Sequence, residues 1–305
     1  MRIWDLRHSR LSGRPLHLSW VVDQNCISSI PLAERAPDSL VNHVATYLDR
    51  ILVRHREVAA QDARDIDQLI QRSLAMGQPR GFRERLLADA VDGISVISEI
   101  KRRSPSKGDL AVGLDPEALA VAYELGGASC LSVLTDEEFF DGSISDLQGA
   151  SSACALPVLR KDFTISRHDV CDARLMGADC VLLIAAALSQ TELQDFYSLA
   201  TRIGLDVLVE IHDEEELSRA IEVGASLIGV NQRDLVTFQV DHARALRMAN
   251  LIPSGVVRVA ESGVRHAQDA AELGAAGYHA VLVGESLVTS PDPSEAVRLL
   301  RSASV

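Results

Sequence analysis

The sequence predicts an α/β protein, specifically a (β/α)8 TIM barrel with additional N-terminal helices capping the barrel. Three observations favour this fold: short apolar runs repeat along the chain, helix signals fall between them, and polar residues follow the runs. Eight such units in about 210 residues favour closure of a parallel sheet into a barrel. The eight runs are GISVISEI (93–100), ASCLSVLT (128–135), LPVLRKD (156–162), DCVLLIA (179–185), DVLVEI (206–211), ASLIGVN (225–231), VVRVAES (256–262) and HAVLVGE (279–285).

Capping residues mark where the intervening helices begin. Asp115 and Asp292 each precede a proline at the first helical position, and Ser189 stands three residues before Glu192, as in a capping box. Glycines mark where helices end, because glycine adopts the left-handed conformation without a Cβ clash. The expected closing glycines are Gly127, Gly177, Gly224 and Gly274.

An open doubly wound sheet is the alternative, but that fold usually carries a G-x-G-x-x-G turn after its first strand. Here the first strand runs into EIKRRSPS. Ahead of the eight βα units (93–300), residues 39–90 are expected to form extra helices, since apolar residues recur at helical spacing from Ser39 to about Ala75. Residues 1–38 lack sustained periodicity and are expected to be a poorly ordered extension. The range 39–305 is therefore predicted to be one catalytic domain.

The composition is that of an ordinary globular chain with an acidic balance. Of 305 residues, 47% are hydrophobic and 24% charged, and the net charge is −13. That charge argues against nucleic acid as a partner, because nucleic-acid binding needs a basic stripe. It also means that an anionic ligand needs a local basic site. No run of 18 apolar residues occurs, so no membrane span is expected.

The cysteines indicate a reducing compartment. Their number is odd and they form no C-x-x-C pair, and several lie in apolar runs, so we expect reduced, buried thiols in a cytoplasmic protein. Their spacing matches no metal site, so no metal is expected. The segment HLSWVVD near the N-terminus is too short and too polar for a signal peptide. The five cysteines are Cys26, Cys130, Cys154, Cys171 and Cys180.

An acid, a base or an amide stands at the end of nearly every predicted strand. In a (β/α)8 barrel these ends share one rim, where the βα loops build the active site. A single charge in such a place is usually a solvated loop residue, but six coincidences on one rim are much less expected. The residues are Glu99 and Lys101 on the first strand, Lys161 on the third, Glu210 on the fifth, Asn231 and Arg233 on the sixth, and Glu261 on the seventh.

Two glycine turns predict a phosphate site on the same rim. ESG follows the seventh strand and VGES follows the eighth, and each precedes a helix. Backbone N–H groups at such turns and at helix N-termini bind anions, and the loops after strands seven and eight usually hold phosphate in this barrel. Arg233 could add a charged clamp. A phosphate can thus bind locally although the chain is acidic.

Taken together, the motifs resemble the indole-3-glycerol phosphate synthase family. The segments ISEIKRRSPSKG, LSVLTDEEFFDGS, LRKDF, GADCVLLIAAAL, VLVEIHDEEEL, IGVNQRDL, AESGV and VGESL occur in the family's order. The likeness runs from about Leu48 to Leu300. The resemblance implies a lyase of tryptophan biosynthesis that converts 1-(2-carboxyphenylamino)-1-deoxyribulose 5-phosphate to indole-3-glycerol phosphate, CO₂ and water. It implies no cofactor and a small phosphorylated substrate as the partner; other tryptophan-pathway enzymes are a further partner that it leaves open.

The resemblance also implies roles for the residues at the strand ends. Lys161 would be the general acid for the carbonyl oxygen. Lys101 would bind the substrate carboxylate, with a share in proton transfer left open. Glu210 would serve the acid–base steps around dehydration. Glu99 and Asn231 would orient these groups. Two neighbouring lysines would also be expected to lower the pKa of one of them.

The remaining implied residues bind the two ends of the substrate. An apolar slot for the aromatic ring would comprise Pro105, Phe140, Phe163 and Leu182, although plain core packing is an equal alternative for Leu182. Glu261 is assigned to substrate binding and Ser262 to the catalytic group beside the phosphate. The residues expected around the phosphate are Ser104, Arg233, Ser262, Gly263, Gly284 and Glu285, the last through its backbone N–H.

Two other functions stay open at this point. An isomerase acting on a related phosphoribosyl amine would call for a Cys/Asp pair near the first and fifth strands, where this chain has Glu99 and Glu210. A barrel that only binds phosphate would be expected to have lost Lys101, Lys161 or Glu210. His168 follows the LRKDF strand by several residues and is interpreted as a solvent-facing helix residue.

Overall fold

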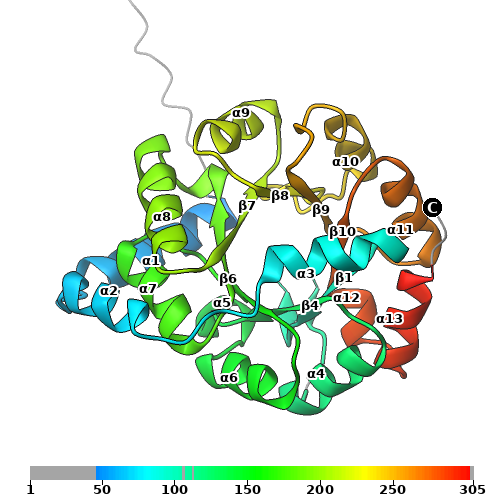
Figure 1. The fold of residues 1–305 in the computed structure, drawn as a ribbon, viewed down its shortest axis with the longest axis horizontal. Coiled ribbons are helices and arrows are strands. Elements are labelled where there is room, and N and C mark those ends of the chain that lie inside the picture. The colour runs from blue at the N-terminus through cyan, green and yellow to red at the C-terminus, as the bar shows by residue number, and fades with distance from the viewer. Residues whose placement is uncertain (1–45, 105–106, 112, 303–305) are drawn as a thin grey trace, which may run out of the picture. The chain divides into compact units, whose positions relative to one another are not determined.

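Eight parallel strands form a closed barrel in the computed structural model, which describes residues 46–104, 107–111 and 113–302 (Figure 1). The order around the barrel is β1-β10-β9-β8-β7-β6-β5-β4, with β4 pairing back onto β1. Each predicted run contains one strand, so the predicted (β/α)8 barrel is confirmed. The strands are β1 (Ser95–Ile100), β4 (Cys130–Leu134), β5 (Val158–Lys161), β6 (Cys180–Ile184), β7 (Asp206–Ile211), β8 (Leu227–Asn231), β9 (Val257–Glu261) and β10 (Ala280–Val283).

Helices surround the barrel and precede it. The outer ring comprises α4 (Pro116–Leu125), α6 (Ile144–Ala153), α7 (Arg167–Met176), α8 (Gln190–Arg202), α9 (Glu214–Glu222), α10 (His242–Met248), α11 (Ala267–Ala275) and α13 (Pro293–Arg301). Ahead of β1 come α1 (Tyr47–Ala60), α2 (Ile66–Leu74), α3 (Phe82–Asp89) and the 3₁₀ turn Ala90–Asp92. Smaller elements are α5 (Glu137–Phe140), α12 (Glu285–Val288), the 3₁₀ turn Ala185–Ala187, and an antiparallel pair outside the barrel, β2 (Arg103–Ser104) with β3 (Gly108–Asp109).

The helix starts follow the predicted capping residues. The Asp115 and Asp292 carboxylates accept backbone N–H groups at the starts of α4 and α13, and Ser189 with Glu192 forms the capping box of α8. Gly127, Gly177 and Gly224 have left-handed backbones behind their helices, as predicted. The prediction for Gly274 is wrong. It lies within α11, and Gly277, with φ 94°, takes the left-handed position behind that helix.

The barrel interior and the space beneath the helices form two separate apolar cores. Along each strand, successive side chains point alternately into the interior core and into the core beneath the helices, because strand side chains alternate between the two faces. Its lower end is closed by α3, which inserts Phe82 and Leu86, both fully buried, against Cys130 and Cys180. Figure 1 shows α3 lying across this end of the barrel, with α1 behind the strands. The site therefore has to form at the opposite, carboxyl end.

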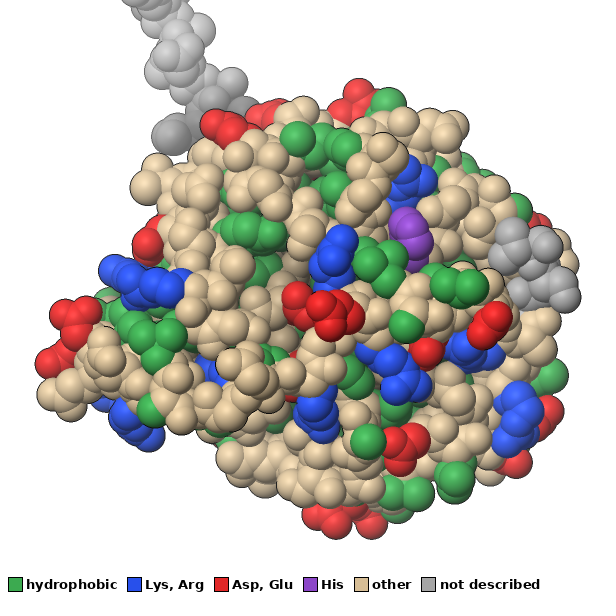
Figure 2. All heavy atoms as spheres, in the orientation of Figure 1, with side chains coloured by type: hydrophobic (Ala, Val, Ile, Leu, Met, Phe, Trp, Pro, Cys, Tyr) green, Lys and Arg blue, Asp and Glu red, His purple; other side chains and the backbone are tan. Residues whose placement is uncertain are grey.

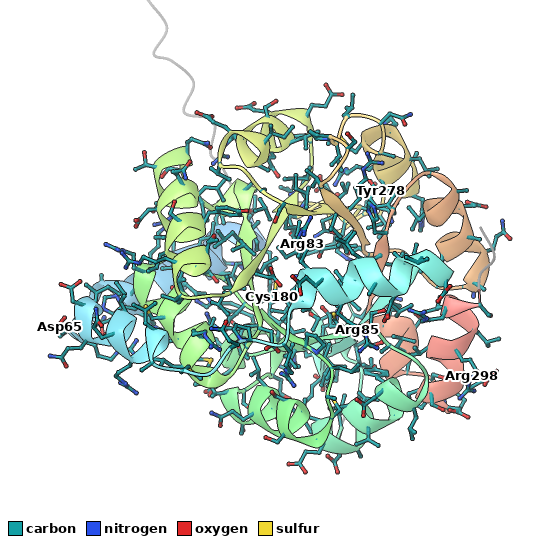
Figure 3. All side chains as sticks on the ribbon, in the orientation of Figure 1. Asp65, Arg83, Arg85, Cys180, Tyr278 and Arg298 are labelled. Carbon is teal, nitrogen blue, oxygen red and sulfur yellow. The ribbon has the colours of Figure 1, made fainter. Side chains whose placement is uncertain are left out.

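Polar contacts fix α3 to the ends of the strands. Arg83, labelled in Figure 3, donates its backbone N–H to Asp206 over 2.8 Å and its guanidinium to the carbonyls of Ser226 and Gly255. These partners stand at the amino ends of β7, β8 and β9. Helix α3, within the 39–90 region predicted to hold extra helices, is thus part of the barrel floor.

Four of the five cysteines lie in the described part of the chain. Cys130, Cys154, Cys171 and Cys180 are free thiols, whereas Cys26 and the predicted extension at residues 1–38 lie outside the described residues. Among the helices that the structure describes, none combines the length and apolar character needed to cross a bilayer. On the face that α3 covers, acidic and basic side chains are interspersed (Figure 2).

Candidate active site

A cavity of about 820 Å³ opens at the carboxyl end of the barrel. Its size suits a small organic ligand, for which pockets of about 300–1,000 Å³ are usual. Every predicted site residue that the structure describes lines it, whereas Pro105 lies outside the described residues. The lining residues from the prediction are Glu99, Lys101, Ser104, Phe140, Lys161, Phe163, Leu182, Glu210, Asn231, Arg233, Glu261, Ser262, Gly263, Gly284 and Glu285.

The first polar group in the cavity joins β5, β7 and β8. Lys161 Nζ lies 3.4 Å from Glu210 Oε2, and Asn231 Nδ2 donates to Glu210 Oε1 over 3.0 Å. Glu210 is almost completely buried, so ionising it depends on these partners. Burial opposes the charge on Glu210, but Lys161, His212 and Asn231 outweigh it and lower the pKa of this carboxyl.

The second polar group stands on β1. Lys101 Nζ is ion-paired with Glu99 Oε2, and both side chains project from the same face of the strand. Gly284, after β10, leaves the room that they occupy, since a Cβ there would collide with Glu99 Oε2. Gly284 therefore allows the turn after β10 to approach the Glu99 side chain on β1 closely. This is in addition to its predicted place near the phosphate.

The expectation of a lowered lysine pKa is wrong for Lys161. Burial acts to lower its pKa, but the charge of Glu210, with smaller contributions from neighbouring acids, outweighs burial and raises it above the usual range. Each lysine faces its own acid, so carboxylates rather than a second ammonium group dominate the environment. Lys161 is therefore held in the protonated form, as a proton donor must be.

Glu261 is a carboxyl without a countercharge of its own. It is 2% exposed, and its Oε1 has no hydrogen-bond partner among the described residues. Burial, with Glu210 nearby, raises its pKa well above the usual range and so favours the neutral acid. Gly229 on β8 makes the space for this carboxyl, because a Cβ there would overlap Glu261 Oε1.

The turn after β9 has the backbone of an anion site. Ser262 and Gly263 are both left-handed, with φ of 65° and 82°. Such a conformation is strained for serine, and strain of this kind concentrates at functional sites. Gln232 Nε2 holds the turn by donating to the Ser262 carbonyl over 2.7 Å. Across the opening, Lys107 Nζ pairs with Glu285 Oε1 over 3.0 Å.

The opposite wall of the cavity is apolar. The rings of Phe140 and Phe163 lie 6.3 Å apart between centroids, inclined at 41°. Leu182, 1% exposed, belongs to the interior core and also forms the cavity floor. Helix α1 adds Leu48 and Ile51 to the lining. The wall can therefore accept a flat aromatic group at the side away from the glycine turns.

Lysine usage identifies Lys107, which the motif ISEIKRRSPSKG contains but to which the sequence prediction assigned no role. The chain has only three lysines, Lys101, Lys107 and Lys161, and all three line this one cavity. Every other cationic side chain, histidine apart, is arginine. Because the proton of an arginine does not leave in proteins whereas that of a lysine can, this distribution singles out Lys107 beside the two predicted lysines.

A cluster near the mouth has the residue types of a metal site. His55, Asp136 and Asp162 bring one potential ligand atom each within 4.8 Å of the others. Their atoms are already engaged, however. His55 Nε2 bonds Asp136 Oδ2 at 2.8 Å, and Asp162 Oδ2 accepts from Thr135 and Arg160. We therefore interpret this cluster as a junction between α1 and the barrel loops.

His168 does not line the cavity. It lies on α7, half-buried, with Nε2 2.9 Å from the Arg64 carbonyl oxygen. The expected helix position is correct, while the expected solvent-facing side chain instead contacts the loop between α1 and α2.

Solved structures with the same fold include several enzymes of sugar phosphates and related compounds. A thiamine phosphate pyrophosphorylase from Pyrococcus furiosus matches with a TM-score of 0.52 at 15% identity, over 70% of this chain and 96% of that one. An N-acetylmannosamine-6-phosphate 2-epimerase from Clostridium perfringens gives 0.52 at 13%, over 65% and 90%. A 3-hexulose-6-phosphate synthase from Salmonella typhimurium gives 0.54 at 13%, over 69% and 98%. At these identities the likeness shows the barrel fold alone.

The family comparison is more specific. Residues 48–300 match the family model described as indole-3-glycerol phosphate synthase. The match begins in α1 and ends in α13, so it includes the capping helices and all eight barrel strands. It also contains every residue of the two cation–carboxylate groups described above. The chain therefore belongs to the indole-3-glycerol phosphate synthase family, the carboxy-lyases that form the indole ring in tryptophan biosynthesis.

Proposed function

We propose that the two cation–carboxylate pairs of this cavity divide the family's reaction between them. The observation that supports this best is that Lys101–Glu99 and Lys161–Glu210 face one cavity from different strands. The family's substrate carries two groups with which a lysine can interact. One is an aromatic carboxylate, and the other is a ketone oxygen that becomes charged as the ring closes. One lysine binds the first, and the other protonates the second.

Lys161 is the general acid of ring closure in this proposal. The aromatic carbon attacks the ketone carbon, the C=O bond opens, and the Lys161 proton moves to the oxygen, which becomes a hydroxyl. The raised pKa of Lys161 keeps that proton in place until the oxygen needs it. Such a positioned donor accelerates a step by about 10²–10⁴-fold.

Lys101 holds the carboxylate that is lost as CO₂. Its ammonium group pairs with Glu99, which keeps it fixed at the end of β1. Binding the substrate carboxylate there brings the adjacent ring carbon towards the ketone. When the carbon–carbon bond to CO₂ breaks, its electron pair restores the aromatic ring, so no external acceptor is required.

Glu210 acts in the dehydration. The hydroxyl formed on ring closure takes a proton from Lys101, which the loss of CO₂ has freed, and leaves as water, while a proton leaves the new five-membered ring. Glu210 accepts this ring proton, and Asn231 holds its other oxygen in position over 3.0 Å. Glu261, whose raised pKa favours the neutral acid, binds the substrate as a hydrogen-bond donor.

The ends of the substrate are held by the two walls. The phosphate lies at the Ser262–Gly263 turn, where Lys107 is within reach, and the aromatic ring lies against Phe140 and Phe163. Holding the chain bent between these walls places the reacting carbons together. Such positioning supplies as much as about 7–11 kcal/mol in well-oriented reactions.

Replacing each lysine by methionine tests the division of roles, because methionine keeps the apolar stem and removes the charge. Lys161→Met should lower kcat at least ~100-fold, with little change in KM. Lys101→Met should raise KM strongly, because its charge is used to bind the substrate carboxylate. Lys107→Met is the matched third variant and should raise KM alone. Steady-state kinetics, followed by indole fluorescence, measures all three.

The affinity of each variant for inorganic phosphate is the control. It should stay near wild type in Lys161→Met and fall in Lys107→Met. Unchanged turnover in Lys161→Met would remove this residue from the proton-donor role.

A further inference from the structure

His212 is a buried, titratable side chain next to the proposed base that the mechanism so far does not use. It follows β7 by one residue, and its Nε2 lies 3.5 Å from Glu210 Oε1. That nitrogen is buried and has no hydrogen-bond partner among the described residues. The side chain itself is only 11% exposed.

The opposite side of the ring is anchored to α9. His212 Nδ1 lies 3.0 Å from Glu216 Oε2, and the same carboxylate oxygen accepts the His212 backbone N–H over 2.8 Å. Because Glu216 offers only acceptors, Nδ1 carries the proton in this contact. The ring orientation is thereby fixed, with Nε2 directed towards Glu210.

The geometry points to His212 as a positioning residue for the reaction: anchored by Glu216, its imidazolium keeps Glu210 ionised while Lys161 is without its proton. This inference rests on the proposed function and adds a residue to it.

The need for a second cation follows from the chemistry of Lys161. Once Lys161 has given its proton to the ketone oxygen, Glu210 faces a neutral amine, Asn231 and the neutral acid Glu261. A buried carboxylate with such neighbours tends to take up a proton, and a protonated Glu210 cannot act as the base of dehydration. A cation on its other oxygen prevents this, and His212 is the side chain placed there.

The charged groups around His212 favour its cationic form. Burial lowers its pKa, but the contacts with Glu216 and Glu210 outweigh burial and raise it. The positive charge of Arg244, on α10, acts to lower the pKa of His212. The Arg244 guanidinium donates to the Asn231 carbonyl over 2.9 Å. The balance leaves the imidazolium between two carboxylates, one catalytic and one structural.

The pH profile of kcat tests the inference. In His212→Gln, Glu210 should take up a proton more readily. The acidic limb of the kcat profile should therefore move to higher pH by about one unit. This corresponds to a loss of up to about tenfold in kcat at pH values below both midpoints of the limb, with values near wild type at pH 9. Glu216→Gln keeps an acceptor for the His212 backbone N–H and should shift the limb in the same direction by less.

Two further variants separate charge from structure. His212→Lys restores a cation and should recover most of the activity lost in His212→Gln on the acidic limb, which a structural role would not allow. Glu214→Gln, in the exposed first turn of the same helix, should leave the profile unchanged. Thermal unfolding of each variant identifies those that lose activity by misfolding.

The outcomes distinguish this inference from the proposed function. An inactive wild-type protein would contradict the function itself. An active wild type, with a folded His212→Gln variant of unaltered profile, would overturn the role of His212 alone. An altered profile that His212→Lys fails to restore would assign His212 to packing and also overturn its electrostatic role.

Discussion

Lysine and arginine have separate tasks in this molecule. The three lysines line the cavity, whereas arginine side chains make structural contacts, as Arg83 does with the Ser226 carbonyl and Arg160 with Asp162. Arginine forms fixed, multiple hydrogen bonds and keeps its charge. Lysine can give up its proton. The choice of lysine or arginine therefore separates most groups that hold the fold from those that we propose for the reaction, although Arg233 and Arg265 also line the cavity.

Arginine substitution tests this separation. Lys161→Arg keeps a cation beside Glu210 but removes the transferable proton, so we expect kcat to fall at least ~100-fold. Lys107→Arg keeps the charge that a phosphate needs and should remain within about threefold of wild type. Steady-state rates of the two variants at one pH provide the comparison. Comparable losses in both would mean that charge alone matters at Lys161.

At the scale of elements, α1 links the loops around the cavity mouth. His55 bonds Asp136 in the loop after β4, and its ring lies 5.4 Å from that of Phe163. Tyr47 is the first residue of α1, and its ring packs edge-on against those of Phe139 and Phe238. Phe139 follows β4 and Phe238 follows β8 in the sequence. A helix placed before the barrel in sequence thus aligns the aromatic wall.

The His55–Asp136 contact predicts a pH-dependent stability. Burial lowers the His55 pKa, but the hydrogen bond to Asp136 and the neighbouring acids raise it above the usual value. A raised folded-state pKa stabilises the protein fully below the unfolded value of about 6.5, and this contribution is lost as pH rises through the folded value. His55→Gln should therefore lower Tm at pH 5.5 by on the order of 2 °C and have less effect at pH 9.

His168→Gln is the matched control, because His168 bonds a backbone carbonyl rather than a carboxylate. Its Tm difference from wild type should vary less with pH. If the two variants show the same pH dependence in thermal unfolding, the contact with Asp136 does not stabilise the junction.

At the scale of the whole molecule, the barrel was predictable because the same pattern, an apolar run followed by helix signals, repeats along the sequence. Each strand is buried on both faces and reads as an apolar run, such as CVLLI in β6. The charged ends were predictable for the same reason, since Glu210 and Glu261 interrupt apolar runs. A (β/α)8 barrel then places such ends on one rim by its topology.

Features that depend on tertiary distance were not predictable. Tyr47 and His55 belong to an amphipathic helix whose sequence does not indicate which loops it meets. His212 stands in the polar segment HDEEEL, which looks like an exposed helix start. The pKa of Lys161 depends on acidic side chains that different strands bring together. Scarcity of lysine was the one sequence signal that could have identified Lys107.

The local basic site also explains how an acidic protein binds an anion. The net charge is −13, but the three lysines and Arg233 line the same cavity, where the glycine turns offer backbone N–H groups. Long-range repulsion between an acidic surface and the phosphate is screened over about 8–10 Å at physiological salt. Short-range contacts within the cavity then decide binding.

The most direct measurement is product formation by the purified protein. Given 1-(2-carboxyphenylamino)-1-deoxyribulose 5-phosphate, the wild type should release CO₂ and form the fluorescent indole product in equal amounts, because one cavity holds both cation–carboxylate pairs. Folded protein that forms neither product would contradict the assignment of this cavity, and CO₂ release without indole would contradict the role given to Glu210.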